Sequence, residues 1–316
     1  MNGAATRHIG ITLVPDFALA SFSMVIEPLR IANRLSGRKL YEWSLLSGEG
    51  GPIMSSAGID LATAAIATTR DTAFDLAMIC AGFHPELYRH PGVLNWLRRH
   101  QRLGKTIGAV STGTFVLARA GLLDDHRCTV HWDYHGALAE LYPNLNVTDD
   151  LYVIDRGIVT SAGSIAALDL MLRLIADHHS VAFSKAVSEQ FVHTRARSSA
   201  EHQRGDLMHR LGTAKPLLLA AVKRMEETLD RPISPADLAR DLGISQRQME
   251  RQFQGHLGRT PIAYHRDLRL DQARRLLSQT SMPVTEIALT CGFGSASHFA
   301  KLYRGRFGRL PNEDRA

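Results

Sequence analysis

A short helix, a glycine turn and a second helix occur in the same order twice in the last third of the chain. In the first copy Ser234 is the expected N-cap, and Pro235 stands at the first helical position, where its missing N–H costs nothing. Gly243 supplies the left-handed turn that ends this helix, and Ser245 caps the next one. The second copy turns at Gly292. The repeat predicts an all-α domain with two helix-turn-helix motifs, at about residues 234–254 and 284–304.

Each motif leaves one face of its second helix for solvent. Pairs of large apolar residues four positions apart, Met249 with Phe253 and Phe299 with Tyr303, are predicted to face inward. The remaining positions are candidates for reading base edges in a major groove, and they are Gln246, Arg247, Glu250 and Arg251 in the first motif and Ala296, Ser297, His298 and Lys301 in the second. An all-helical interaction module with a merely solvated basic face is the alternative.

The positive charge of the chain is concentrated in this region. The 316 residues contain 37 Lys and Arg against 31 Asp and Glu, a formal net charge of +6. Residues 216–316 hold 16 of the basic and 11 of the acidic side chains (net +5), which leaves 21 and 20 (net +1) for residues 1–215. A helix predicted over 261–278 adds arginines expected to face solvent or phosphates, namely Arg266, Arg269, Arg274 and Arg275. This distribution favours a polyanionic partner for the tail alone.

The tail resembles the AraC/XylS family DNA-binding domain over the stretches 238–253, 258–264, 268–277, 287–293 and 297–311. The resemblance implies sequence-specific binding to promoter DNA, usually as a transcription activator that acts on RNA polymerase. It places Arg247, Glu250 and Arg251 on the first reading helix and Ala296, Ser297 and Lys301 on the second. Contacts from Arg to guanine O6 and N7 are the expected direct readout, whereas the small Ala296 and Ser297 favour phosphate contacts for the second helix.

The first two thirds of the chain alternates short apolar runs with helical segments, which is typical of a parallel sheet with helices on both faces. Strands are predicted at 9–14, 41–47, 76–80, 106–110, 151–154 and 158–160, and helices at 24–35, 92–103, 114–120, 137–141, 165–176 and 183–192. A polar stretch without apolar periodicity follows. We therefore expect an α/β domain at 1–195, a connection at 196–213, partly helical, and the all-α domain at 214–316.

Ser111 stands at the tip of a small-residue turn between a predicted strand and helix. This is the location of a nucleophile elbow, where the helix N-terminus favours a developing anion. Backbone N–H groups near Ala81 and Gly82, at the end of the preceding strand, are a second candidate anion site.

A hydrolase or amidotransferase-like enzyme is the alternative function. Ser111 would be its nucleophile, His131 its base, and Asp133 or Asp155 the carboxylate that orients the base. Against catalysis, Ala109 occupies a position where the hydrolase pattern requires glycine, and no acidic partner stands at a fixed spacing.

This region resembles the DJ-1/PfpI-like branch of class I glutamine amidotransferase folds, as fused to AraC-type tails in GlxA-like regulators. The resemblance rests on the motifs at 27–33, 110–113, 117–124, 129–132 and 160–169. Enzymes of that family carry Cys at the elbow, where this chain has Ser111. They also carry a carboxylate after the first strand, and this chain does not match it, because that position falls near Ser21. The resemblance implies a flavodoxin-like fold. Both departures predict that its pocket binds a ligand and does not turn it over, so we expect no enzyme.

The fused subfamily includes regulators of arginine, carnitine and glycine betaine catabolism, so the resemblance implies a small amino acid or quaternary amine as effector. Such a ligand needs a carboxylate site and a cation site, the latter from aromatic faces or an acidic group. The candidate ligand-binding residues are Phe17, Glu27, Gly82, Ser111, Thr112, Gly113, His131 and Trp132. Core packing of Trp132, a structural role for His131, and pairing of Glu27 with Arg30 are equally open.

Three cysteines, Cys80, Cys128 and Cys291, are an odd number without C-x-x-C spacing, which predicts neither a disulfide framework nor a zinc site. Residues 1–10 lack a basic and apolar leader, and charged residues interrupt the apolar stretch 154–176. We expect a cytoplasmic homodimer without metal or other cofactor, whose partners are double-stranded promoter DNA, a small-molecule effector and RNA polymerase, with no membrane association.

Overall fold

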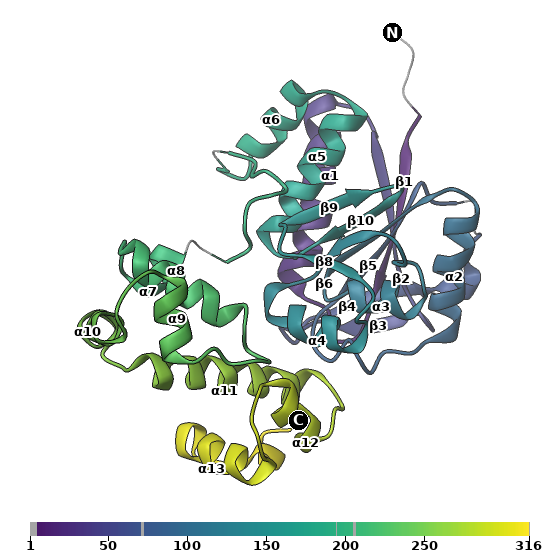
Figure 1. The fold of residues 1–316 in the computed structure, drawn as a ribbon. Helices are drawn as coiled ribbons and strands as arrows, with labels where there is room; N and C mark the ends of the chain where they lie inside the picture. The colour runs from purple at the N-terminus through teal and green to yellow at the C-terminus, as the bar shows by residue number, and fades with distance from the viewer. Residues whose placement is uncertain (1–4, 71–72, 194, 205–206, 316) are drawn as a thin grey trace. The chain divides into compact units, whose positions relative to one another are not determined.

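The computed structural model describes residues 5–70, 73–193, 195–204 and 207–315 (Figure 1). The chain divides into two compact units, and the boundary between them falls between Gln203 and Arg204, inside the range predicted for the connection. Residues 196–203 belong to the first unit.

The first unit is built on one large sheet. Its strands in chain order are β1 (Arg7–Leu13), β2 (Tyr41–Ser47), β3 (Gly51–Met54), β4 (Asp60–Ala65), β5 (Leu76–Ala81), β6 (Thr106–Ser111), β9 (Tyr152–Asp155) and β10 (Ile158–Ser161). Their order across the sheet is β3-β4-β2-β1-β5-β6-β10-β9. Neighbouring strands are parallel except for the two edge pairs, β3 with β4 and β9 with β10. The short β7 (Arg127–Thr129) and β8 (Asn146–Thr148) form a separate parallel pair.

Helices cover both faces of the sheet, as the sequence predicts. Figure 1 shows α1 (Leu19–Ser36), α5 (Ile165–His178) and α6 (Val181–Glu189) on one face and α2 (Pro91–Arg102) with α3 (Thr114–Arg119) on the other. The 3-10 helices η1 (Ile66–Thr68) and η2 (Trp132–Tyr134) and the helix α4 (His135–Leu141) complete the unit. Every residue of β5 is buried, because a central parallel strand has helices above and below it.

All predicted strands and helices of this unit are present, with ends that differ by a few residues. The sequence did not predict β3, β4, β7 and β8. Along β4 exposed and partly buried positions alternate, and its residues are mostly Ala and Thr, so it carries little of the apolar signal that marks the central strands. The predicted α/β class is confirmed.

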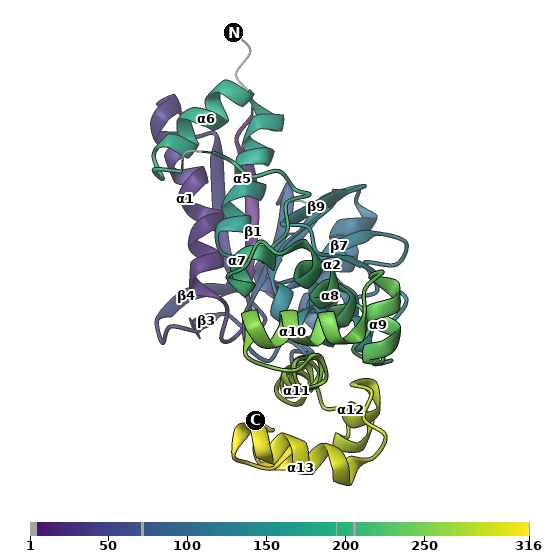
Figure 2. The same cartoon turned by 60° about the vertical axis from the view of Figure 1, so that its left-hand side comes forward.

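The second unit is helical throughout its described residues (Figure 2). Its helices are α7 (Leu207–Leu211), α8 (Pro216–Glu226), α9 (Pro235–Asp241), α10 (Gln246–Leu257), α11 (Pro261–Gln279), α12 (Val284–Thr290), α13 (Ala296–Phe307) and the 3-10 turn η3 (Pro311–Glu313). One core cluster joins α8, α9 and α10 through fully buried side chains such as Val222, Met249 and Phe253. The short α7 lies within the range predicted for the connection.

Among the described helices, none combines the length and the apolar character that crossing a lipid bilayer requires.

Candidate nucleic-acid interface and ligand site

The first helix-turn-helix motif is formed by α9 and α10. The Ser234 hydroxyl accepts the Asp237 N–H at 3.1 Å, and the Ser245 hydroxyl accepts the Gln248 N–H at 3.2 Å, so serine caps begin both helices as predicted. Gly243 lies between them with φ 67°, a left-handed conformation that glycine adopts without strain. These local signals fix the angle at which α10 leaves the turn.

One face of α10 is free of protein contacts that would bury it. Met249 and Phe253 are fully buried, and the side chains predicted to read DNA are all exposed, namely Gln246, Arg247, Glu250 and Arg251. Gln246 donates to Glu250 at 2.9 Å across one helical turn. Three of the four, Arg247, Glu250 and Arg251, line an open depression of about 690 Å³ together with Ser245 and Thr260. The two guanidinium groups form no ion pair within the described part of the chain.

The second motif, α12 and α13, repeats this geometry. Its turn glycine, Gly292, has φ 70°, and a Cβ there would lie 2.7 Å from Cδ of Pro232. The Ser295 hydroxyl accepts the His298 N–H at 3.2 Å and begins α13, while Phe299 and Tyr303 are fully buried. Glycine is therefore required at this turn for both its dihedral angle and its close packing.

Of the predicted second reading face, Ser297, His298 and Lys301 are exposed, and Ala296 is half-buried. Arg304, which the sequence analysis did not select, is also exposed and lies one turn beyond Lys301. A helical projection of the segment from Lys301 would have found it. The face is thus more basic than predicted.

Arg269 does not face solvent, which corrects the prediction for the helix α11. Its guanidinium donates to the carbonyl oxygens of Cys291 at 2.8 Å and Gly292 at 2.6 Å, and it lies 4.1 Å from the centre of the Phe293 ring. Burial lowers the pKa of this group, with the Cys291 interaction opposing the shift. Arg269 therefore supplies donors to two carbonyls that follow α12.

The other arginines of α11 also have partners within the unit. Arg274 pairs with Asp314 at 2.9 Å, and Arg275 donates to Gln272 at 2.8 Å. Arg266 pairs with Asp267 at 3.0 Å. The predicted phosphate contacts from this helix would compete with these interactions.

In the first unit, Ser111 lies at a strained strand-to-helix turn. It ends β6 with φ 59°, an uncommon conformation for a residue with a side chain, and it is 6% exposed. The turn is held from two sides: Thr112 Oγ1 donates to the Gly82 carbonyl at 2.6 Å, and Gly163 packs against Ser111. Ser21 Oγ accepts the Ser164 N–H at 2.8 Å, which brings the start of α5 to the same place. The residues around the predicted elbow are therefore assembled from four segments.

Gly82 and Gly113 have structural reasons for lacking a side chain. A Cβ on Gly82 would lie 2.0 Å from the carbonyl oxygen of Asp16, and one on Gly113 would lie 2.7 Å from that of Ile79. Both glycines allow the loops after β5 and β6 to approach their neighbours closely, which is compatible with, and separate from, a role in binding.

His131 and Trp132 follow β7 and lie partly buried, with ring centroids 5.5 Å apart. Thr114 Oγ1 donates to the Thr129 carbonyl at 2.7 Å and so ties this segment to the start of α3. Burial lowers the pKa of His131, against the opposing charge of Asp133. The imidazole is therefore predominantly neutral at pH 7.

The groups of a catalytic relay are not joined. Among the described residues, no hydrogen bond connects His131 to Ser111, and His131 Nδ1 accepts the backbone N–H of Asp133 at 3.4 Å. Asp155 cannot orient His131, because its carboxylate accepts the N–H of Arg127 and pairs with Arg156. That part of the alternative hypothesis was wrong.

Two of the predicted ligand residues have partners within the protein. Phe17 is fully buried, and its ring packs edge-on against Phe22 with centroids 5.5 Å apart. Glu27 forms an ion pair with Arg30 at 2.6 Å on the outer surface of α1. The Phe17 ring and the Glu27 charge therefore have partners within the first unit, and for Glu27 this is the pairing with Arg30 that the sequence analysis left open.

A carboxyl group that the sequence analysis missed lies after β5. Glu86 is 8% exposed, and its Oε2 has no hydrogen-bond partner among the described residues. Burial raises its pKa, which the nearby His84 and Arg119 partly oppose. Arg119, the last residue of α3, donates to the carbonyls of Pro85, Glu86 and Tyr88 and so fixes this loop to the end of the helix that follows the elbow. Nothing in the local sequence marks Glu86, because its burial depends on these distant partners.

Comparisons with known proteins agree with both halves of this description. Residues 238–316 match the helix-turn-helix domain family model, and residues 23–177 match the DJ-1/PfpI family. The HTH-type transcriptional regulator CdhR of Pseudomonas aeruginosa is 42% identical over 96% of this chain and 90% of its own, and the HTH-type transcriptional regulator GlxA of Rhizobium meliloti is 38% identical over 96% and 94%.

Among solved structures, an AraC family transcriptional regulator from Pseudomonas putida is similar to this chain at a TM-score of 0.54 and 26% identity, over 58% of this chain and 99% of that one. The chain therefore belongs to the GlxA-like HTH-type transcription regulators, in which a DJ-1/PfpI domain is followed by an AraC-type DNA-binding domain.

Proposed function

We propose that this regulator is a ligand-responsive, promoter-specific activator of genes for the catabolism of a small amino acid or quaternary amine, of the arginine, carnitine or betaine type. It acts as a homodimer in the cytoplasm and contacts RNA polymerase. The observation that carries the proposal is the strained Ser111 elbow, assembled in a unit that shares its chain with two exposed basic reading helices.

The helix α10 supplies most of the base-specific contacts. Arg247 and Arg251 are one turn apart, exposed and without acidic partners within the described residues, so both are available for bidentate contacts with guanine. Gln246 and Glu250 bond one another in the absence of DNA and exchange this bond for contacts with bases.

The helix α13 reads fewer bases. The half-buried Ala296 and the short Ser297 offer little reach, whereas His298, Lys301 and Arg304 present positive or titratable groups. Contacts with phosphates set register and orientation but carry no sequence information directly.

The effector binds where the loops after β5, β6 and β7 meet. Ser111, Thr112 and Gly113 offer the start of α3 to a carboxylate, together with Gly82, while His131 and Trp132 offer aromatic surface for an ammonium group. Glu86 replaces Glu27 as the acidic group for a cation, since a buried carboxyl with one oxygen unbonded among the described residues gains from a positively charged ligand.

The site binds and does not catalyse. Within the described residues no hydrogen bond joins Ser111 to His131. The carboxylate position that the family resemblance places near Ser21 has no acidic residue at Ser21, whose Oγ accepts the Ser164 N–H. A hydrolase attached to a DNA-binding domain is the second candidate, favoured only by the elbow itself. Turnover of ester and amide substrates by the wild type but not by Ser111→Ala would establish that candidate.

A thermal-shift panel of amino acids and betaines tests the sensor. A ligand at 100 times its dissociation constant should stabilise the protein by about 2.7 kcal/mol. The same compound should alter retention of a cognate promoter fragment, and Glu86→Gln should weaken binding of cationic members of the panel more than Glu27→Gln does. If no compound shifts either the melting temperature or DNA retention, the sensor role is wrong.

A further inference from the structure

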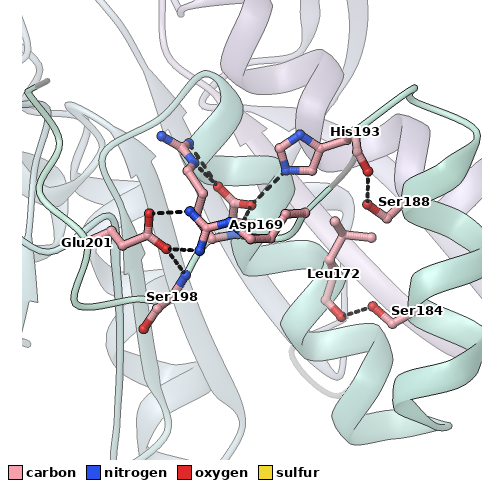
Figure 3. A network of polar contacts seen from close by, with 9 residues as sticks. Asp169, Leu172, Ser184, Ser188, His193, Ser198 and Glu201 are labelled. Atoms are coloured by element: carbon pink, nitrogen blue, oxygen red, sulfur yellow. Dashed lines mark hydrogen bonds and ion pairs between the residues drawn. The ribbon is translucent and has the colours of Figure 1, made fainter.

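The segment of residues 195–203, here called the strap, is bound to the first unit through a buried carboxylate. Asp169 lies on α5 with a fully buried side chain. It accepts the backbone N–H of Arg197 at 2.9 Å, the Arg197 Nε at 2.9 Å and Nη2 at 2.8 Å, and it lies 3.2 Å from Nε2 of His193 (Figure 3). Four bonds thus converge on one carboxylate, and all come from residues that follow α6.

A second anchor holds the end of the strap. The Gln203 amide donates to Thr129 Oγ1 at 2.9 Å, to the Val130 carbonyl at 2.9 Å and to the Asp150 carbonyl at 3.0 Å. Between the two anchors, the Leu151 N–H donates to the Ser199 carbonyl at 2.9 Å. The strap therefore lies along the edge of the unit with its backbone and side chains bonded.

The strap also has internal bonds that do not involve the rest of the unit. Glu201 accepts both terminal nitrogens of Arg195 at 2.9 Å and the N–H of Ser198 at 2.8 Å. The Arg195 side chain is largely exposed and Glu201 is partly exposed, so this pair is the natural comparison for the buried one.

Both anchors belong to elements that meet at the Ser111 elbow. The helix α5 carries Asp169, and its start contacts Ser21 and Ser111 through Ser164 and Gly163. Thr129 and Val130, which hold Gln203, directly precede His131. A shift of either element at the elbow acts on an anchor within a few residues.

We propose that the strap is a releasable coupling segment, bound by Asp169 and Gln203 in one state and freed in the other, which converts occupancy of the elbow into a change in how far the DNA-binding unit can reach. This inference rests on the function proposed above. Freeing residues 195–203 would add about 30 Å of reach at full extension, enough to change which half-site spacings a dimer tolerates.

The buried charge makes the coupling sensitive to single substitutions. The cationic and N–H donors around the Asp169 carboxylate offset the free-energy cost of burying it. Asp169→Asn keeps the shape but removes the charge, and Arg197 can then move into water. We expect the strap to be freed without loss of the fold.

Limited tryptic digestion of the full-length protein tests the release. Cleavage after Arg197 should be slow in the wild type and faster by about tenfold or more in Asp169→Asn, because local opening governs access to the protease. Glu201→Gln, which removes only the exposed pair, should leave the rate nearly unchanged. Gln203→Ala removes the second anchor without leaving a buried charge unpaired, and it should also accelerate cleavage. It serves as the second variant if Asp169→Asn does not fold.

Binding to DNA tests the coupling. Wild-type protein should discriminate between a cognate promoter and one with about five base pairs, half a helical turn, inserted between half-sites, and Asp169→Asn should discriminate less. Equal cleavage rates in the wild type, Asp169→Asn and Gln203→Ala would contradict the proposal that the strap is held by these anchors. Faster cleavage with unchanged spacing preference would overturn the coupling. If the wild type selects no promoter sequence, the proposed function itself fails, while the digestion still measures release.

Discussion

Gly163 packs directly against Ser111: a Cβ built on Gly163 would lie 2.8 Å from the Cβ of Ser111 and 2.6 Å from Ser21 Oγ. Gly163 also has φ 90°, outside the range that side chains favour. Two independent constraints therefore require glycine beside the elbow, and they can be separated experimentally.

Gly163→Ala should destabilise the first unit by roughly 2–4 kcal/mol, because an added methyl group clashes and the backbone is strained. Gly157→Ala is the matched control: Gly157 has φ 84° with open space around it and should cost only about 1–2 kcal/mol. Urea denaturation measures both. Equal losses in the two variants would mean that the contact with Ser111 adds nothing.

Arg247→Ala and Arg251→Ala should each weaken binding to a cognate promoter by about 1–3 kcal/mol and reduce discrimination against scrambled DNA. His256→Ala, an exposed change on the last turn of the same helix, should have little effect. Fluorescence anisotropy with both DNAs gives the comparison. Unchanged retention in the double variant would remove α10 from the interface.

Lys301→Ala should act differently, because the proposed contact of Lys301 is with phosphate. Affinity should fall by a similar factor for cognate and scrambled DNA, and the slope of log affinity against log salt should decrease by about 1. A loss confined to the cognate sequence would instead assign Lys301 to base readout.

Arg269→Ala should destabilise the DNA-binding unit by about 1.5–3 kcal/mol, since charged hydrogen bonds to the Cys291 and Gly292 carbonyls and the contact with Phe293 are lost. DNA binding should then fall through partial unfolding and recover on cooling or stabilisation. Arg269→Lys keeps the charge but cannot donate equally to both carbonyls, so its stability should lie between those of the wild type and Arg269→Ala. A fully folded Arg269→Ala variant with weaker DNA binding would point to phosphate contact after all.

His178 should make stability depend on pH. Its Nδ1 lies 3.0 Å from the Tyr41 hydroxyl, and burial, followed by the charge of Arg7, lowers its pKa from the usual 6.5 to about 4. As pH falls from 6.5 towards 4, His178 becomes protonated in the unfolded chain but stays mostly neutral in the native protein. Stability is therefore full above pH 6.5, declines across this window and levels off below it. Because solvent screens this half-buried ring, we expect a loss of only about 1 kcal/mol.

His178→Gln keeps a hydrogen-bonding group beside Tyr41 and removes the titration. Urea unfolding at several values between pH 7.5 and 4 should show a shallower decline for this variant than for the wild type. Parallel curves would show that other groups account for the acid sensitivity.

The local signals in the sequence were sufficient for the reading helices. The caps Ser234 and Ser245, the turns at Gly243 and Gly292, and the inward pairs such as Met249 with Phe253 all involve residues within a few positions of each other. Backbone geometry acts over this range, so the pattern alone determined where α9, α10, α12 and α13 begin and which faces are exposed.

The sequence predicted the turn at the elbow but not the residues that surround it. The small residues around Ser111 predicted the turn, but its neighbours come from far along the chain: Gly163, Ser21 and the loop after β5. The burial of the Phe17 ring has the same origin, because a single sequence does not state which side of a loop meets the sheet.

The sequence by itself determined the two domain classes, the exposed faces of α10 and α13 and the position of the elbow, since each follows from short-range periodicity and capping. Only the tertiary structure decided that Glu86 is buried, that Arg269 closes α12, and that Asp169 and Gln203 hold the strap. The physical reason is that burial and ion pairing depend on partners brought together by the packing of the sheet and its helices, and these partners lie far apart along the chain.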